Sequence, residues 1–181
     1  MPHIHTEPGQ HDHTVTAYIV RIDTDQPRAL VHMHKKLGKL MPIGGHVELD
    51  ETPWRSMAHE LREEAGYDMV DLRILQPVNR IKALARVILH PYPVAMNTHN
   101  FFDDRVGEHY HSDTAYAFVA NGAPGHKVGD GESTDLRWLG QKELANLRED
   151  QIFINNREVS DFIFQTVLST WEAVDTAEFE R

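Results

Sequence analysis

Three glutamates, Glu60, Glu63 and Glu64, stand close together in the segment 44–67, which reads GGHVELDETPWRSMAHELREEAGY. Residues three or four apart share one face of a helix, where like charges repel by about a few tenths of a kcal/mol per pair. Carboxylate oxygens are the ligands that Mg²⁺ and Mn²⁺ prefer, and these ions commonly bridge a protein to substrate phosphates. On spacing alone, a solvent-exposed charged face is the favoured interpretation, and a divalent metal site that handles phosphate is the alternative.

Helix start and stop signals frame these glutamates. Thr52 is a helix-capping residue type, Pro53 follows it at the first helical position, and Gly66 is typical of a helix end. At about 100° per residue, the apolar side chains gather on one side of the helix and the glutamates on another. The apolar residues are Trp54, Ala58, Leu61 and Ala65. The helix therefore has an acidic face that is distinct from its apolar face.

β-Branched and aromatic runs elsewhere predict a sheet. Residues 14–23 (TVTAYIVRID) and 28–34 (RALVHMH) predict two strands of a hairpin. We expect further strands over 69–75, 114–120 and 135–140, a brief helix over 141–147 and a C-terminal helix over 156–174 that packs on the core. Gly and Pro in the segment 34–45 predict a loop, and residues 90–113 are the least regular part of the sequence.

The composition is that of an ordinary soluble protein, with 181 residues, 40% of them hydrophobic and 25% charged. We expect a polar, histidine-rich N-terminal tail over 1–13 and one domain over 14–181. A net charge of −10 argues against binding to nucleic acid polymers, which need a basic patch. The absence of cysteine excludes thiolate metal sites and fits a reducing compartment. With no apolar run long enough to span a bilayer and no signal peptide, we expect a cytoplasmic protein that does not bind membranes.

The segment around the glutamates resembles the conserved box of the Nudix hydrolase family. The residues in register with that box are Gly45, Glu51, Glu60, Leu61, Glu63, Glu64 and Gly66. Two positions depart from it: His59 stands where the family has Arg, and Tyr67 stands where an aliphatic residue is usual. The family's Arg makes an ion pair within the box, and imidazole is shorter and lacks the bidentate fork of Arg. The resemblance extends from about Thr14 to Leu147.

This resemblance implies an α/β fold, a Nudix-type α/β/α sandwich around a mixed β-sheet. It also implies hydrolysis of a nucleoside diphosphate linked to another group, by attack of water on phosphorus with Mg²⁺ or Mn²⁺ as cofactor. The implied metal ligands are the Gly44 carbonyl, Glu60, Glu63 and Glu64, with Glu132 as a further ligand that matches the spacing seen in MutT-type members. The implied catalytic residues are Glu60, Glu63 and Glu132, with Glu60 or Glu132 as the base.

Histidines are frequent, with 13 in the chain. His109, His111 and Asp113 alternate, so on a strand they would share one face. If that face borders the acidic helix, His109 and His111 would contact substrate phosphate; a surface strand face is the alternative. His46 follows the glycine pair and would donate to a phosphate oxygen or bond within its loop. Four others lie in the N-terminal tail: His3, His5, His11 and His13.

Three functional hypotheses remain open. The first is a Nudix pyrophosphohydrolase, with a nucleoside triphosphate cleaved to monophosphate and pyrophosphate as the favoured reaction. The second is a Nudix-fold nucleotide sensor weakened at His59. The third is a histidine-rich metal-binding protein, whose metal affinity would depend on residues 1–13 and not on Glu63. Three aromatic residues are candidates for stacking on a base: Phe101, Phe102 and Tyr110. The C-terminal helix would support a homodimer if its apolar stripe exceeded what the sheet covers.

Overall fold

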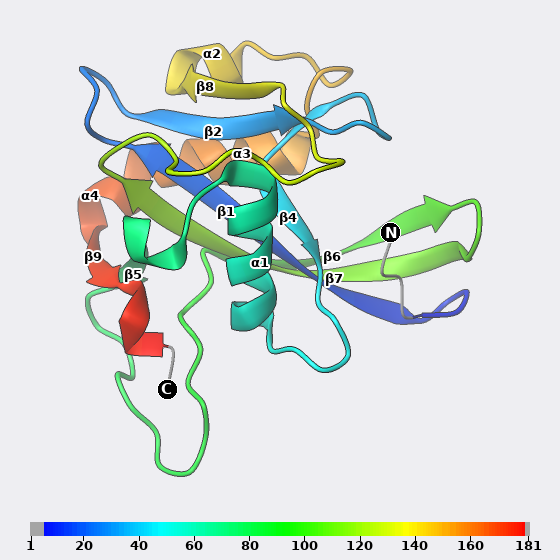
Figure 1. The fold of residues 1–181 in the computed structure, drawn as a ribbon, viewed down its shortest axis with the longest axis horizontal. Coiled ribbons are helices and arrows are strands. Elements are labelled where there is room, and N and C mark those ends of the chain that lie inside the picture. Colours follow the sequence, from blue (N-terminus) through cyan, green and yellow to red (C-terminus); the bar gives the residue numbers. More distant parts are fainter. Residues whose placement is uncertain (1–5, 180–181) are drawn as a thin grey trace.

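A mixed β-sheet forms the middle layer of the structure, a computed structural model that describes residues 6–179 (Figure 1). Within those residues the sheet has nine strands: β1 (His11–Arg21), β2 (Arg28–Met33), β3 (Leu40–Met41), β4 (Ile43–His46), β5 (Leu72–Pro77), β6 (Ala95–Asp103), β7 (Gly107–Ala120), β8 (Leu136–Gly140) and β9 (Trp171–Asp175). The long strands β1 and β7 run parallel at its centre, from the pair His11 and Tyr110 to the pair Arg21 and Ala120. The other pairings are antiparallel.

Helices cover both faces of the sheet. They are α1 (Pro53–Ala65), α2 (Gln141–Ala145), α3 (Ile154–Phe162), the π-helical turn η2 (Ile163–Val167) and α4 (Leu168–Thr170), with short 3₁₀ turns at η1 (Met69–Asp71) and η3 (Thr176–Phe179). Figure 1 shows α1 on one side of β1 and β7, and α3 on the other. This arrangement is the expected α/β sandwich. No helix within residues 6–179 is long and apolar enough to cross a membrane.

The alternation of side chains along the central strands creates two hydrophobic cores. On one face, Ile19 and Phe118 pack with Leu61 of α1. On the other face, Ala117 packs with Val167 of the C-terminal helix. Successive side chains of a strand point to opposite faces, so both faces of a central strand carry apolar residues when helices cover both.

Helix α1 begins and ends where its sequence signals place it. The Thr52 hydroxyl accepts a hydrogen bond from the Arg55 N–H at 3.3 Å, and Pro53 is the first helical residue. Gly66 ends the helix with a left-handed backbone at φ 72°, and its N–H bonds the Arg62 carbonyl. This end redirects the chain towards β5.

The strand predictions hold with shifted boundaries. The hairpin of β1 and β2 is confirmed, and β1 begins three residues before the predicted start, so His11 and His13 belong to a strand. The predicted tail residues His3 and His5 lie outside the described residues. The strand predicted at 69 begins at Leu72, after η1. The predicted loop 34–45 contains β3 and β4, because both have partners in the sheet.

Two expectations about regularity are wrong. The segment 90–113 is not irregular: β6 and the start of β7 form a hairpin there, with the pairs running from Ala95 and Ala115 to Asp103 and Gly107. Its many polar residues obscured the strand pattern, because β6 is exposed over most of its length. The C-terminal helix ends at Thr170 rather than 174. Trp171 instead starts β9, whose backbone pairs with β5.

We predict that Gly66→Ala destabilises the fold by about 2 kcal/mol or more. An added Cβ carries the left-handed penalty of roughly 1–2 kcal/mol and would lie 2.2 Å from the His126 carbonyl oxygen. Gly38→Ala is the matched control, because Gly38 also has a positive φ (62°) but nothing within 4 Å of an added Cβ. Urea unfolding measures both variants. Equal losses in the two variants would contradict the contact with His126.

Candidate functional site

The acidic face of α1 lies against the glycine pair of β4. A Cβ at Gly45 would lie 2.1 Å from Glu60 Oε1, so a side chain there would displace that carboxylate from its present position. The Gly44 N–H donates a hydrogen bond of 2.9 Å to Glu64 Oε2. The pairing of β4 with β1 fixes the glycine pair in the sheet, opposite Val15 and Thr16. The sheet and the helix together hold two of the three helical carboxylates at one place.

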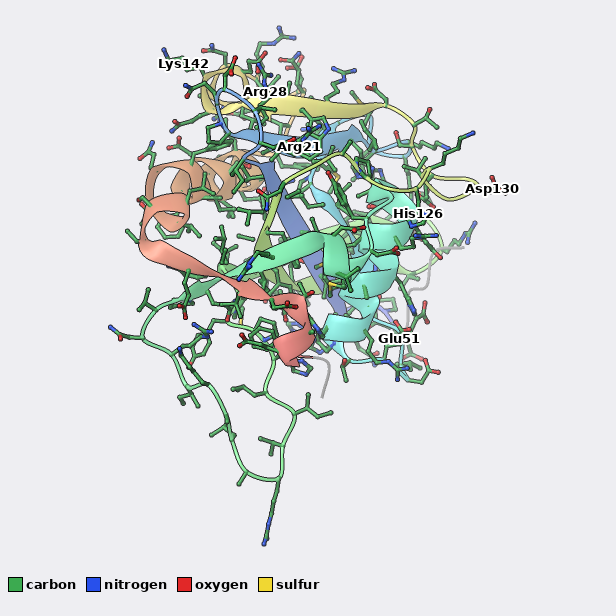
Figure 2. The ribbon with its side chains drawn as sticks, turned by 60° about the vertical axis from the view of Figure 1, so that its left-hand side comes forward. Arg21, Arg28, Glu51, His126, Asp130 and Lys142 are labelled. Atoms are coloured by element: carbon green, nitrogen blue, oxygen red, sulfur yellow. The ribbon has the colours of Figure 1, made fainter. Side chains whose placement is uncertain are left out.

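The loop after β7 brings Glu132 to the same place. This loop is pinned to the end of α1, because Gly129 N–H donates to the Glu63 carbonyl at 2.6 Å and His126 N–H donates to the Gly66 carbonyl at 3.0 Å. Figure 2 shows the loop at His126 and Asp130 at one end of α1, and Glu51 at the other. The Lys35 ammonium bonds the Gly131 carbonyl at 2.6 Å and holds the loop from a second side. Glu132 is therefore brought beside Glu60 and Glu64 from a distant part of the sequence.

Burial and repulsion by neighbouring carboxylates raise the pKa values of Glu60 and Glu64. Burial raises the pKa of Glu60 to about 7, and the charges of Glu63 and Glu132 add to the shift. Burial raises the pKa of Glu64 to about 8, with Glu60 and Glu132 adding to it, although the Gly44 N–H favours the charged form. Two carboxylates that share a site cannot both ionise easily. A cation among them would remove this cost.

The donor set fits a hard divalent cation. The groups that meet at the glycine pair are carboxylates, the ligand type that suits Mg²⁺ and Mn²⁺, and the space that a Cβ would fill at Gly45 is left to the Glu60 carboxylate. Within residues 6–179, no group of three or more acidic or histidine side chains is already arranged to hold a metal ion. The fit therefore rests on the chemistry of the donors and on the raised pKa values of Glu60 and Glu64.

His59 contacts a carboxylate of the loop before α1. Its Nδ1 lies 2.8 Å from Oε1 of Glu51, which links the middle of α1 to the loop before it. The Glu51 side chain is 15% exposed and that of His59 is 65% exposed. Imidazole thus reaches the carboxylate despite its shorter length, although with one nitrogen instead of the two-pronged fork of Arg.

A cavity of about 630 Å³ adjoins the glycine pair on the face of the sheet away from the core of α1. Its wall includes Gly44 and Gly45 from the site just described, and the adjacent His46. The lining contains no Lys or Arg among the described residues. Its floor is polar: the Asp113 carboxylate accepts hydrogen bonds from the hydroxyls of Thr14 at 3.0 Å and Thr16 at 2.8 Å. The cavity therefore suits an uncharged group with hydrogen-bonding atoms better than a phosphate.

The predicted histidines separate into two that line the cavity and one that does not. His46 and His111 line it, and their Nε2 atoms are 3.3 Å apart. His109 is fully buried behind His111, with an Nε2 to Nε2 distance of 3.1 Å, and does not line the cavity; its contact with phosphate stays a prediction. Burial, together with His46, His99 and His109, lowers the pKa of His111 to about 3, so His111 is neutral at pH 7.

Of the three aromatic candidates for stacking on a base, one lines the cavity and two do not. The Phe101 ring lines the cavity and stacks on His111 with ring centroids 4.5 Å apart. Tyr110 stacks on His11 instead, and Phe102 is 67% exposed on a sheet edge; neither lines the cavity.

His32 is a site residue that sequence reasoning missed. It is buried, its Nε2 lies 3.8 Å from Glu64 Oε2, and its Nδ1 has no hydrogen-bond partner. Burial lowers the pKa of His32 to about 4, so it is neutral beside the carboxylates. The signal was present in the strand RALVHMH, where a histidine occupies a position that alternation assigns to the buried side with Leu30.

Comparisons with known proteins agree on one family. A family model described as the NUDIX domain matches residues 12–162. Solved structures with the same fold include a NUDIX family hydrolase from Clostridium perfringens, at 25% identity and a TM-score of 0.58, covering 83% of this chain and 93% of that one. The NUDIX domain of NrtR from Shewanella oneidensis, complexed with ADP ribose, matches at 13% identity and a TM-score of 0.57, covering 83% and 84%.

An Ap4A hydrolase from C. elegans matches at 13% identity and a TM-score of 0.52, covering 81% of this chain and 92% of that one. No curated protein matches the sequence.

We predict that the metal-free protein loses stability as the pH rises from 6.5 to 8.5. The folded-state pKa values of Glu60 (about 7) and Glu64 (about 8) lie above the ordinary value of 4.5, so the folded state binds more protons than the unfolded state. Stability from such groups is present at low pH and is lost as the pH rises through the folded pKa values. His32 and His111 have lowered pKa values and act in the opposite direction only below about pH 6.5. Denaturant unfolding with a chelator present should show a loss on the order of a few kcal/mol.

Two controls accompany this measurement. Glu64→Gln should flatten the dependence between pH 6.5 and 8.5, because it removes the group with the larger shift. Excess Mg²⁺ or Mn²⁺ should also flatten it, by binding the ionised carboxylates of the folded state. A stability that is constant or rises over this range without metal would show that the carboxyl groups ionise normally.

Proposed function

The chain belongs to the Nudix hydrolase family, whose members act on nucleotide pyrophosphate bonds, and we propose that it is a pyrophosphohydrolase dependent on Mg²⁺ or Mn²⁺. The observation that carries the proposal is the meeting of Glu60 and Glu64 with Glu132 at the glycine pair, where their charges oppose one another. Such a cluster destabilises the fold when no cation is bound. It is useful in a protein that must hold cations beside phosphate.

The proposed metal ligands are the Gly44 carbonyl and the carboxylates of Glu60, Glu63, Glu64 and Glu132. A bound divalent cation would neutralise phosphate oxygens and lower the pKa of water. Glu60 or Glu132 would accept the proton of the attacking water. Glu132 lies on the loop after β7, whereas the other carboxylates lie on α1, so it reaches the site from a separate element. The Gly44 N–H orients Glu64 through its hydrogen bond, and His59 steadies the preceding loop through Glu51.

The proposed substrate is a nucleoside diphosphate linked to another group, with a nucleoside triphosphate cleaved to monophosphate and pyrophosphate as the favoured case. The cavity supports a nucleoside at this place, because no Lys or Arg of residues 6–179 lines it, it adjoins the carboxylates, and Phe101 offers an aromatic face. His46 and His111 would donate or accept hydrogen bonds on the same wall, and His109 would hold His111 in place. The pyrophosphate would then lie at the metal site, where cations are available.

We predict that a panel of nucleoside triphosphates, nucleotide sugars, ADP-ribose and dinucleoside polyphosphates contains a substrate cleaved only with Mg²⁺ or Mn²⁺. Glu63→Gln should lower kcat by about 100-fold or more, because catalysis depends on charge stabilisation at the phosphate. Glu149→Gln is the matched control, since Glu149 is an exposed glutamate distant from α1 in the sequence, and should keep full activity. Released phosphate after coupling enzymes provides the readout.

The outcome also separates the competing functions. No turnover by a folded protein that binds metal would favour the nucleotide sensor. Transition-metal binding that Glu63→Gln leaves intact, and that deletion of residues 1–13 abolishes, would favour the histidine-rich metal-binding protein. Turnover that is equal in wild type and Glu63→Gln would contradict the proposed metal site.

We also predict that His59→Ala lowers kcat by about tenfold, because the loop before α1 loses its contact with the helix and small misplacements of ligands cost rate. His59→Arg should retain activity at or above the wild-type value, since Arg can reach Glu51 with two donors. The comparison of kcat for the three proteins measures this. Equal activity of His59→Ala and wild type would show that the contact with Glu51 has no role in the reaction.

A further inference from the structure

Strand β6 is a long sheet edge with one free side. Within residues 6–179 it pairs only with β7, over nine residue pairs from Ala95 to Asp103. It is exposed along most of its length, and its two large apolar side chains that point to solvent, Met96 and Phe102, are 72% and 67% exposed. The hairpin of β6 and β7 extends away from the helices (Figure 1), so no helix covers this edge. A free edge of this length is a template for pairing with another strand.

The hydrogen bonds of β7 show which groups of β6 are free. Tyr110 N–H donates to the Gln10 carbonyl on the β1 side, whereas the Ala115 carbonyl accepts from Val94 on the β6 side. Alternate residues of a strand direct their N–H and C=O to opposite sides, so the odd-numbered residues of β7 bond β6. Their partners are the odd-numbered residues of β6, such as His99 opposite His111. The N–H and C=O groups of the even-numbered residues therefore point to the free side: Met96, Thr98, Asn100 and Phe102.

The chemistry of this edge favours a second copy of the chain. Proteins commonly protect edges with charged residues or proline, but residues 95–102 (AMNTHNFF) contain no Lys, Arg, Asp, Glu or Pro. The chain as a whole carries a net charge of −10, so two copies repel one another over most of their surfaces. An uncharged edge is where two such chains can approach with least repulsion.

The edge is also complementary to itself in one register. If two β6 strands pair antiparallel about a two-fold axis at His99, Met96 of each copy lies opposite Phe102 of the other, and Thr98 lies opposite Asn100. The outward N–H and C=O groups of all four even-numbered residues then find partners. The two most exposed apolar side chains of the strand cover one another on the solvent face, at both ends of the pairing.

We propose that the protein forms a homodimer in which the β6 strands of two copies pair antiparallel about His99 and join the two sheets into one. The two-fold axis is perpendicular to the sheet, so both cavities open on the same face. Asn97 and His99 belong to the cavity wall, and the second copy lies directly beside them. The dimer surface is thus the outer wall of the cavity rather than the C-terminal helix, whose Ile163 and Val167 are already buried on the sheet.

Sedimentation velocity over a range of concentrations tests the dimer with the full chain. Wild type should show a monomer–dimer equilibrium. Thr98→Pro should raise the dimer dissociation constant at least tenfold, because its N–H points to the free side and is not used in the pairing with β7. Val70→Lys is the control, because Val70 is an apolar residue that is 78% exposed outside this edge, and should leave the dimer unchanged. A monomer at every concentration, or a dimer insensitive to Thr98→Pro, would overturn the proposal.

Cysteine cross-linking tests the register, and it does not depend on how well Thr98→Pro folds. The chain has no cysteine, so a single introduced thiol is unique. His99 and its copy would form a non-hydrogen-bonded pair with Cα atoms about 4.5 Å apart, within the range of about 4.4–6.8 Å that a disulfide spans. His99→Cys should therefore give a disulfide-linked dimer on mild oxidation. Thr98→Cys should not, since its copy lies diagonally, roughly 7–8 Å away. Equal cross-linking of the two variants, or none by His99→Cys, would overturn the register.

Discussion

The close approach of strand β4 to helix α1 is the constraint on which the site depends. A Cβ at Gly44 would meet the Val15 carbonyl at 2.2 Å on the sheet side, and a Cβ at Gly45 would meet Glu60 at 2.1 Å on the helix side. A side chain at Gly44 would push β4 away from β1, and a side chain at Gly45 would displace the Glu60 carboxylate from its position beside β4. The glycine pair therefore sets both the position of the acidic face and the distance between the carboxylates and a ligand in the cavity.

The two sides of this site have opposite electrostatic character. On the helix side, burial and repulsion raise the pKa values of Glu60 and Glu64 to about 7 and about 8, and a cation bound among them would relieve that repulsion. Burial also lowers the pKa values of His32, which lies beside Glu64, and of His111, which lies in the cavity wall, so these imidazoles stay neutral. The charge needed to hold phosphate is therefore not supplied by these buried histidines. This division supports a cation at the carboxylates and an uncharged part of the ligand in the cavity.

The sequence was most informative where local signals and chemistry coincide. Thr52, Pro53 and Gly66 mark the ends of α1 because capping is a local property of the chain. The hairpin of β6 and β7 could not be predicted in the same way, since its strands are polar and their pairing depends on the rest of the sheet. His109 could be assigned to a strand face by alternation, but its burial behind His111 depends on packing across β6 and β7. Glu132 was found by the resemblance to a family, because its loop reaches α1 only through tertiary hydrogen bonds.

The most direct test of the account is the location of Mn²⁺ in crystals of the protein, determined from anomalous diffraction. The account predicts anomalous peaks among Glu60, Glu63 and Glu64, next to the Gly44 carbonyl, and their loss in Glu63→Gln crystals grown under the same conditions. Peaks that lie only at the histidines of the cavity wall, or an ordered acidic face that holds no Mn²⁺ at a saturating concentration, would contradict it.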